Sequence, residues 1–196
     1  KIANDAITGA KLGDDAVATA NIGDGQVTAA KLASGVGGKV LQVVSVVKTD
    51  TASNSTGSQS TWEFNDSSLR VQITGTSTSN KFLFIGQVTT GGEISTHIGL
   101  RDGETSSNVT GMMATGTGNT RASTSGHDQS DSHSASTVPI IGLISVPDTN
   151  QHTYYFQFSH TSGNTQTIFI NRGSSSGDNA ERGRYISSLQ VMEIAG

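Results

Sequence analysis

Aliphatic side chains recur at every fifth residue near the start of this 196-residue chain. On an α-helix, residues five apart differ in direction by roughly 140°, so they form no common face. On a strand, an odd spacing sends them to alternate faces. The spacing therefore predicts short extended and turn pieces that repeat along an axis, as in a fibre. The seven positions form the aliphatic ladder: Ile2, Ile7, Leu12, Val17, Ile22, Val27 and Leu32.

The aliphatic ladder also predicts self-association. Burial of seven side chains cannot offset the conformational entropy lost when the backbone around them is ordered, and a single copy offers no second layer to pack against. Identical chains wound about a common axis would bury the ladder and add hydrogen bonds between chains. The alternative is a disordered Ala/Gly-rich linker, but a linker does not require Ile, Val or Leu at every fifth place.

Residues between the ladder positions favour turns at matching places in each group of ten. The pairs Asn4-Asp5, Asp14-Asp15 and Asp24-Gly25 are turn formers. Thr8 and Thr28 each follow an aliphatic residue, and we expect their side chains to cap single helical turns.

Composition favours an all-β protein and argues against several partners. The chain has no Cys, two Pro, 14% charged residues and a net charge of −4, and it is rich in Ser, Thr and β-branched residues. We expect no nucleic-acid partner and no membrane insertion, because basic patches and long apolar runs are missing from the sequence. Gly35, Gly37 and Gly38 mark a boundary between a shaft, residues 1–38, and a head, residues 39–196. The first residue is Lys, and we expect the shaft to continue upstream.

The head reads as short strands. Apolar residues alternate with polar ones at 69–74 and 94–101, which predicts strands with one wet face. The segments 40–47, 82–88 and 139–146 are apolar in both phases, so we expect the core to cover one face and neighbouring subunits the other. Further strands are predicted at 152–159, 166–171 and 185–194, and the total suits a jelly-roll-like β-sandwich.

Two polar segments are candidate recognition surfaces. Residues 102–137 contain only three large apolar side chains, and such long loops are often functional. The segment 172–184 carries three Arg residues. The alternative is an insertion without a binding role. The candidate receptor-binding residues are His127, Asp128, Asp131, His133, Arg172, Arg182 and Arg184.

The sequence indicates neither a metal site nor an enzyme. His and Asp at 127–133 are metal-ligand types, but their spacing matches no strong motif, and a Ser-rich loop does not fix ligand geometry. No nucleophile elbow, paired-carboxylate signature or phosphate-binding Gly motif is present in the sequence. We therefore expect no catalytic residues and no cofactor.

Several sequence pieces resemble bacteriophage fibre proteins. ITGAKL and VATANIGDGQVTAAKL resemble the shaft repeats of bacteriophage tail fibres and related virion fibres, which commonly read I-x-D-G-A-V-T-x-A-K-L. Downstream, KVLQVVSVVKTDT, STSNKFLFIGQV, GLRDG, FINRG and RGRYISSLQVMEIAG resemble a β-rich domain of fibre-like proteins from marine and environmental phages. The resemblance implies a homotrimer with a slender shaft leading to a β-sandwich head.

The resemblance further implies a non-enzymatic virion fibre that mediates attachment to the bacterial host. Its partners would be its own copies, other virion proteins and a bacterial surface glycan or protein, and it would be assembled in the host cytoplasm. Two alternatives stay open. The first is a structural role in the virion, as a head fibre, capsid decoration or connector. The second is a bacterial trimeric adhesin or extracellular filament subunit.

Overall fold

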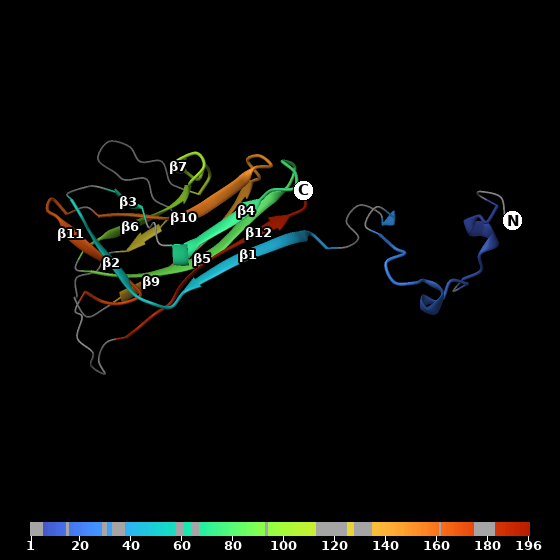
Figure 1. Ribbon diagram of the computed structural model, residues 1–196, viewed down its shortest axis with the longest axis horizontal. Coiled ribbons are helices and arrows are strands. Elements are labelled where there is room, and N and C mark those ends of the chain that lie inside the picture. The colour runs from blue at the N-terminus through green and yellow to red at the C-terminus, as the bar shows by residue number, and fades with distance from the viewer. Residues whose placement is uncertain are drawn as a thin grey trace. The chain divides into compact units, whose positions relative to one another are not determined.

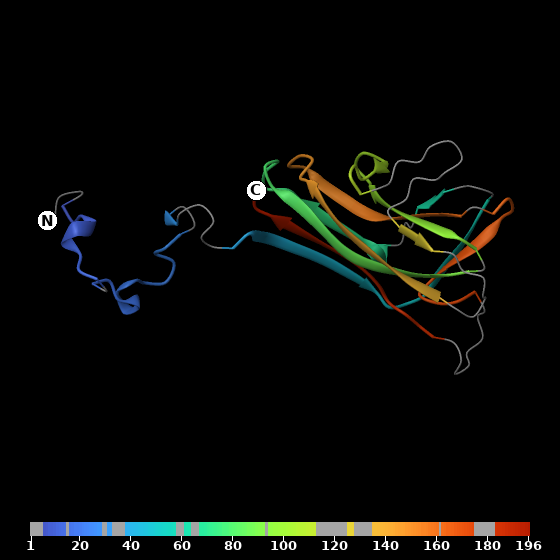
Figure 2. The same ribbon diagram turned by 180° about the vertical axis from the view of Figure 1, so that it is seen from behind.

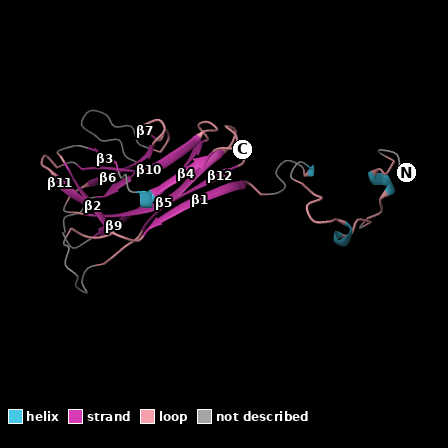
Figure 3. Cartoon of the chain, viewed as in Figure 1, coloured by secondary structure: helices cyan, strands magenta, loops and turns pink. Residues whose placement is uncertain are grey.

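The computed structural model consists mostly of antiparallel β-strands with almost no helix, which confirms the all-β prediction (Figures 1 and 3). The chain divides into two compact units, residues 1–39 and 40–196. The structure describes residues 6–14, 16–28, 31–32, 38–57, 61–63, 67–92, 94–112, 125–127, 135–160, 162–174 and 183–196.

The first unit repeats a pair of turns with a period of ten residues. Short 3₁₀ turns lie at η1, Gly9–Lys11, and η2, Thr19–Asn21. The amides of Lys11, Asn21 and Lys31 each donate to the carbonyl three residues earlier, at 2.8–2.9 Å. A second hydrogen bond joins the Ala16 amide to the Gly13 carbonyl and recurs from Gln26 to Gly23, both at 3.1 Å, around the predicted Asp24-Gly25 turn. Of the predicted Asp14-Asp15 pair, Asp15 lies outside the described residues. The ten-residue sequence repeat is therefore also a repeat of backbone geometry.

The predicted capping by the Thr8 side chain is wrong, and the capping by Thr28 stays a prediction. Thr8 precedes η1 in an extended conformation, as a cap should, but its side chain makes no capping hydrogen bond. Its carbonyl oxygen accepts from the Lys11 amide instead. The Lys11 ammonium further donates to the carbonyl of Ala6 at 2.8 Å. Backbone hydrogen bonds and the Lys11 side chain therefore close this turn without a threonine cap.

The second unit contains two six-stranded antiparallel sheets (Figures 1 and 2). The first sheet contains β1 (Val40–Lys48), β2 (Ala52–Thr56), β5 (Lys81–Gly91), β9 (Ala135–Ser145), β11 (Gln166–Ile170) and β12 (Ser187–Ile194). The second contains β3 (Thr61–Glu63), β4 (Arg70–Thr74), β6 (Thr96–Asp102), β7 (Ser107–Asn108), β8 (Ser125–His127) and β10 (Gln151–His160). A 3₁₀ turn, η4, covers Ser67–Leu69.

In places two strands lie end to end and pair with the same neighbouring position of the sheet; each such position is called a lane here, and each sheet is four lanes wide. In the first sheet β1 and β2 form one lane, β12 and β11 the next, then β5 and β9. In the second, β4 and β3 both pair with β10, which pairs with β6, and β7 and β8 both pair with β6. Every one of these pairings is antiparallel.

Asn171 holds the junction where β11 gives way to β12 in their shared lane. Its side-chain amide donates to the carbonyls of Lys48 and Asp50, both at 2.9 Å, between β1 and β2. Its Oδ1 accepts from the Ser187 hydroxyl at 2.6 Å. Asn171 itself has φ 60°, a left-handed conformation that asparagine tolerates better than most residues. One buried side chain thus joins the ends of four strands.

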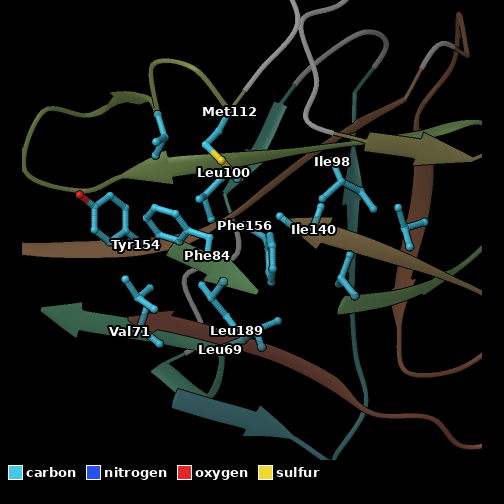
Figure 4. Close-up of a cluster of buried hydrophobic side chains, with 14 of the residues drawn as sticks. Leu69, Val71, Phe84, Ile98, Leu100, Met112, Ile140, Tyr154, Phe156 and Leu189 are labelled. Atoms are coloured by element: carbon cyan, nitrogen blue, oxygen red, sulfur yellow. The ribbon is translucent and has the colours of Figure 1, made fainter. Parts of the chain in front are cut away.

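The inner faces of the two sheets share one hydrophobic core (Figure 4). Phe84 of β5 meets Tyr154 of β10 edge-on, with ring centroids 4.9 Å apart. The strand at 70–74 buries its odd-numbered residues and exposes Gln72 and Thr74, which confirms its predicted wet face. The central part of the core comprises Leu69, Val71, Phe84, Ile98, Leu100, Ile140, Phe156 and Leu189.

The segment 102–137 contains more structure than its polarity predicts. Val109 and Met112 are buried in the core, β7 and β8 pair with β6, and β9 already begins at residue 135. The strands β2 and β3 were likewise not predicted, because their sequences carry few apolar residues. These strands continue lanes that stronger strands begin, so their pairing depends on neighbours rather than on their own pattern.

Candidate functional site

The outer face of the first sheet is an unusual surface, because it exposes several large aliphatic side chains. The three segments predicted to be apolar in both phases become β1, β5 and β9, and all three lie in this sheet. The pairing registers align their outward residues in rows across all four lanes. The first row is Val43, Met192, Leu83 and Leu143, and the next is Ser45, Gln190, Ile85 and Ile141.

This outer face is apolar and uncovered in the single chain. Ile141 is 70% exposed, and Val43, Val47, Ile85 and Leu143 are also exposed. Contiguous apolar patches of this kind are rare on monomeric proteins and mark interaction surfaces. The single chain buries only one apolar phase of these strands, so their coverage by neighbouring subunits stays a prediction.

The outer face also carries a hollow and a protruding side chain. A hollow of about 360 Å³ lies over β12, where Ser188 and Gln190 stand between Val47 of β1 and Ile85 of β5. Gly86 borders the hollow through its backbone, because its phase in β5 is the core-facing one of Phe84 and Val88. Ile141 projects from the next lane. The same face therefore carries both a depression and a protruding aliphatic side chain.

The aliphatic ladder is likewise exposed within one chain. Ile7, Leu12, Val17, Ile22 and Val27 are between 42% and 55% exposed. Leu32 is half-buried, and Ile2 lies outside the described residues. None of the described residues of the first unit is buried. The described part of the first unit therefore has no core of its own, as the ladder predicts for a single copy.

The candidate receptor-binding residues are only partly described. The backbone of His127 pairs with Thr96 at the end of β6. Arg172 lies with its guanidinium 4.5 Å from the centroid of the Phe169 ring, and Arg184 is exposed. The amide of Tyr185 donates to the carbonyl of Asn171, so the backbones beside these two arginines lie close together. The others fall outside the described residues: Asp128, Asp131, His133 and Arg182.

An Asp-His-Asp cluster lies at one end of the core, where sequence reasoning assigned no site; His152 and Asp102 are buried in it, and Asp148 is partly exposed. His152 is 2% exposed. Its Nδ1 lies 2.7 Å from the Asp102 carboxylate, and its Nε2 lies 3.0 Å from the Asp148 carboxylate. A ring with a carboxylate on each nitrogen is a donor on both sides, which is the protonated form. Burial opposes that charge, but both carboxylates outweigh it and raise the pKa of His152.

The two carboxylates hold the His152 ring in a fixed orientation. A histidine that acts as a general base needs a free ring nitrogen facing its proton donor, and both nitrogens of His152 are occupied. A hydrogen bond from the Asn150 amide and the contact with His152 lower the pKa of Asp148. The cluster thus fixes the 148–152 turn onto the end of β6.

The cluster predicts a pH dependence of stability. A raised histidine pKa contributes stability that is fully present below the ordinary pKa of 6.5 and is lost as pH rises through the folded-state pKa. We expect the melting temperature to fall on the alkaline side. In Asp148→Asn the fall should begin at lower pH, because one of the two attracting carboxylates is gone. Calorimetry across about pH 5 to 9 tests this; overlapping profiles for the two proteins would contradict it.

A second buried network surrounds Glu193 of β12, which is 0% exposed. Its Oε1 accepts from the Thr76 amide, the Thr76 hydroxyl and the Asn80 side-chain amide at 2.7–2.8 Å. Its Oε2 accepts from the Gln42 amide at 2.5 Å. Burial raises the pKa of Glu193, but these donors prevail and lower it to about 2. The carboxylate therefore ties β1, the 75–80 turn and β12 together.

The alternation of buried and exposed residues along the strands carries a sequence signal for the Asp-His-Asp cluster and for Glu193, which continues the buried phase of Leu189 and Val191. His152 continues the buried phase of Tyr154, Phe156 and Phe158, and Asp102 continues that of Ile98 and Leu100. A polar residue in the phase of a core-facing row indicates a buried polar group. Their pairing partners, by contrast, depend on strand order and could not be read from the pattern.

Within the described parts of the chain, no group of three His, Cys, Asp or Glu is arranged to hold a metal ion. No described helix is long and apolar enough to cross a lipid bilayer. No protein-family model matches the chain. No curated protein gives a significant match either.

Proposed function

We propose that this chain is a homotrimeric, non-enzymatic bacteriophage virion fibre protein that mediates attachment to the bacterial host surface. The observation that carries the proposal is the apolar outer face of the first sheet, which follows the exposed aliphatic ladder in the same chain. Both are apolar surfaces that association would bury. The resemblance of the shaft repeats to phage fibres supports a homotrimeric fibre as the assembly.

In this proposal the head is a jelly-roll sandwich. Its eight lanes in chain order are β1/β2, β3/β4, β5, β6, β7/β8, β9, β10 and β11/β12. The first lane pairs with the eighth, the second with the seventh, the third with the sixth and the fourth with the fifth. This nested pairing is the arrangement of a doubled Greek key, and jelly rolls are common in viral structural proteins.

Further copies of this chain are the partner that suits the outer face. Its only charged outward side chain in the paired rows is Lys81, which donates to the Ser145 hydroxyl at 2.9 Å. The face therefore offers little to a charged partner. Its hollow and its projecting Ile141 lie at different places, and a cyclic assembly pairs different parts of one face. β1 also begins directly where the first unit ends, so copies joined along the ladder bring their first strands together.

The ladder gives a direct test. Leu12→Asp with Ile22→Asp should make residues 1–39 sensitive to protease while the head stays folded, because charges would enter the proposed axis of the shaft. Asn21→Asp with Gln26→Asp is the matched control, since both residues are exposed and outside the ladder. Sedimentation of the wild type should give a trimer. A folded wild-type monomer would refute the proposed assembly.

Attachment rests on multivalency. Three heads on one shaft would multiply weak contacts into firm adhesion. The test is binding of the intact trimer to host cells, together with the position of the protein in the phage particle. Binding with a distal position supports attachment. A position between other virion proteins, without cell binding, would favour the connector role instead.

A further inference from the structure

We infer that a preformed pocket in the head binds one neutral sugar residue of a host glycan; the choice of a host glycan rests on the proposed function. The pocket has a volume of about 440 Å³, within the range of small-molecule sites. It lies between the β6–β7 connection, the end of β9 and the start of β10. Its lining includes Asp102, Asn108, Val109, Leu143, Pro147 and Tyr154.

The loop that forms one wall of this pocket is held in place. The Arg101 guanidinium donates to Asn108 Oδ1 at 3.3 Å and to the carbonyl of Ser106. The amide of Val109 donates to the carbonyl of Leu100 at 3.0 Å. Met112 anchors the end of the loop, packing so tightly on Gly142 of β9 that a Cβ there would lie 1.7 Å from its sulfur. A ligand would therefore not bear the cost of ordering this wall.

The Tyr154 hydroxyl is a polar group of this pocket that lacks a hydrogen-bond partner among the described residues. Tyr154 is 1% exposed, and its hydroxyl is buried. In Figure 4 its ring lies beside Phe84 and its hydroxyl points away from the apolar cluster. Buried tyrosine hydroxyls usually find a partner, and an unmet one costs about 1–3 kcal/mol. A sugar hydroxyl in the pocket would supply that partner.

The charge in the pocket selects a neutral ligand. Asp102 is the only charged residue among those that line it. Its carboxylate accepts from the Glu104 amide and from His152, which offsets its charge while leaving acceptor capacity for a ligand hydroxyl. An anionic ligand would meet this carboxylate, and a cation would find it already paired. Burial and the nearby carboxylates raise the pKa of Tyr154, so its phenol stays a neutral donor.

The walls match the two kinds of surface on a sugar ring. Val109, Leu143 and Pro147 offer apolar surface for its C–H groups. Thr105 and Ser107 also line the pocket; their hydroxyls lie 2.6 Å apart and can donate hydrogen bonds to, or accept them from, ring hydroxyls. A mixed lining of this kind, with a few polar groups fixing orientation, is typical of small-ligand pockets.

The test is saturation-transfer NMR on the full chain with neutral methyl hexosides and N-acetylhexosaminides, with glucuronate and choline as charged probes. We expect transfer to at least one neutral sugar and to neither charged probe. Tyr154→Phe should weaken that binding about tenfold, equivalent to about 1.4 kcal/mol, without lowering the melting temperature. Tyr155→Phe is the matched control, because the next side chain of the strand faces the opposite side, where the Arg70 guanidinium lies 4.7 Å from its ring centroid.

Three results would overturn the inference: no transfer to any neutral sugar, equal transfer to the charged probes, or unchanged binding in Tyr154→Phe. Cell attachment separates this inference from the proposed function. Attachment that survives in Tyr154→Phe refutes the pocket as the receptor site and leaves the fibre function standing. A wild-type chain that binds sugar but neither trimerises nor attaches to cells refutes the fibre function alone.

Discussion

Val43→Glu combined with Ile141→Glu should leave the head folded but monomeric. The two residues lie on the edge lanes of the first sheet, and both are exposed in the single chain. In a trimer that covers the outer face, each glutamate would be a buried charge without a partner, at a cost of about 3–5 kcal/mol. Because about 1.4 kcal/mol is a factor of ten, the pair should weaken association at least about a thousandfold.

The matched control adds the same charge to the other sheet. Gln72→Glu with Thr74→Glu places two glutamates on the exposed face of β4, which no proposed contact covers. Sedimentation should show a trimer for this control and a monomer for Val43→Glu with Ile141→Glu, with equal circular dichroism. If both variants remain trimers, the outer face is not the subunit interface, and another partner must cover it.

Periodicity alone could predict the longer strands and the second apolar phase of three of them. A period of two shows which residues share a face, and segments with two apolar phases indicate strands that need cover on both sides. The segments at 40–47, 82–88 and 139–146 carry that information locally. Their placement in one sheet was still not readable from the sequence, because β1, β5 and β9 are far apart in the chain, and β1 reaches β5 only through β12, whereas β5 pairs directly with β9.

Residues whose role depends on distant partners could not be predicted. Asn171 looks like an ordinary turn residue until β1, β2 and β12 meet around it. His152 and Asp102 are fifty residues apart and meet only because β6 and β10 are neighbours. The ladder behaves in the opposite way. Its turns repeat every ten residues through local hydrogen bonds, so sequence spacing was a sufficient guide to them.

Glu193→Leu should destabilise the head by about 3–5 kcal/mol, the cost of breaking a buried charged network by removing one partner. Leucine has a similar shape, but it would leave the Thr76 amide and the donors of Asn80 and Gln42 facing an apolar group. Glu193 joins the C-terminal strand β12 to the 75–80 turn and to β1, so these three elements should be destabilised together. Chemical denaturation of the wild type and the variant measures the difference directly.

Glu193→Gln separates the charge from the shape. Its amide oxygen can still accept from Thr76, but its NH₂ group would meet the Gln42 donor, so we expect a smaller loss of about 1–2 kcal/mol. The lowered pKa of the wild-type carboxyl contributes stability that is present above about pH 4.5 and is lost as pH falls toward 2. Glu193→Gln should therefore show a shallower loss of stability in acid than the wild type.

An exposed acidic residue provides the control for both variants. Glu104 is exposed, and Glu104→Leu should change stability by less than about 0.5 kcal/mol, as is usual for surface sites. A Glu193→Leu loss no larger than that of Glu104→Leu would mean that the network is not held in solution. Equal acid profiles for the wild type and Glu193→Gln would mean that other carboxyls, such as Asp148, carry the acid sensitivity.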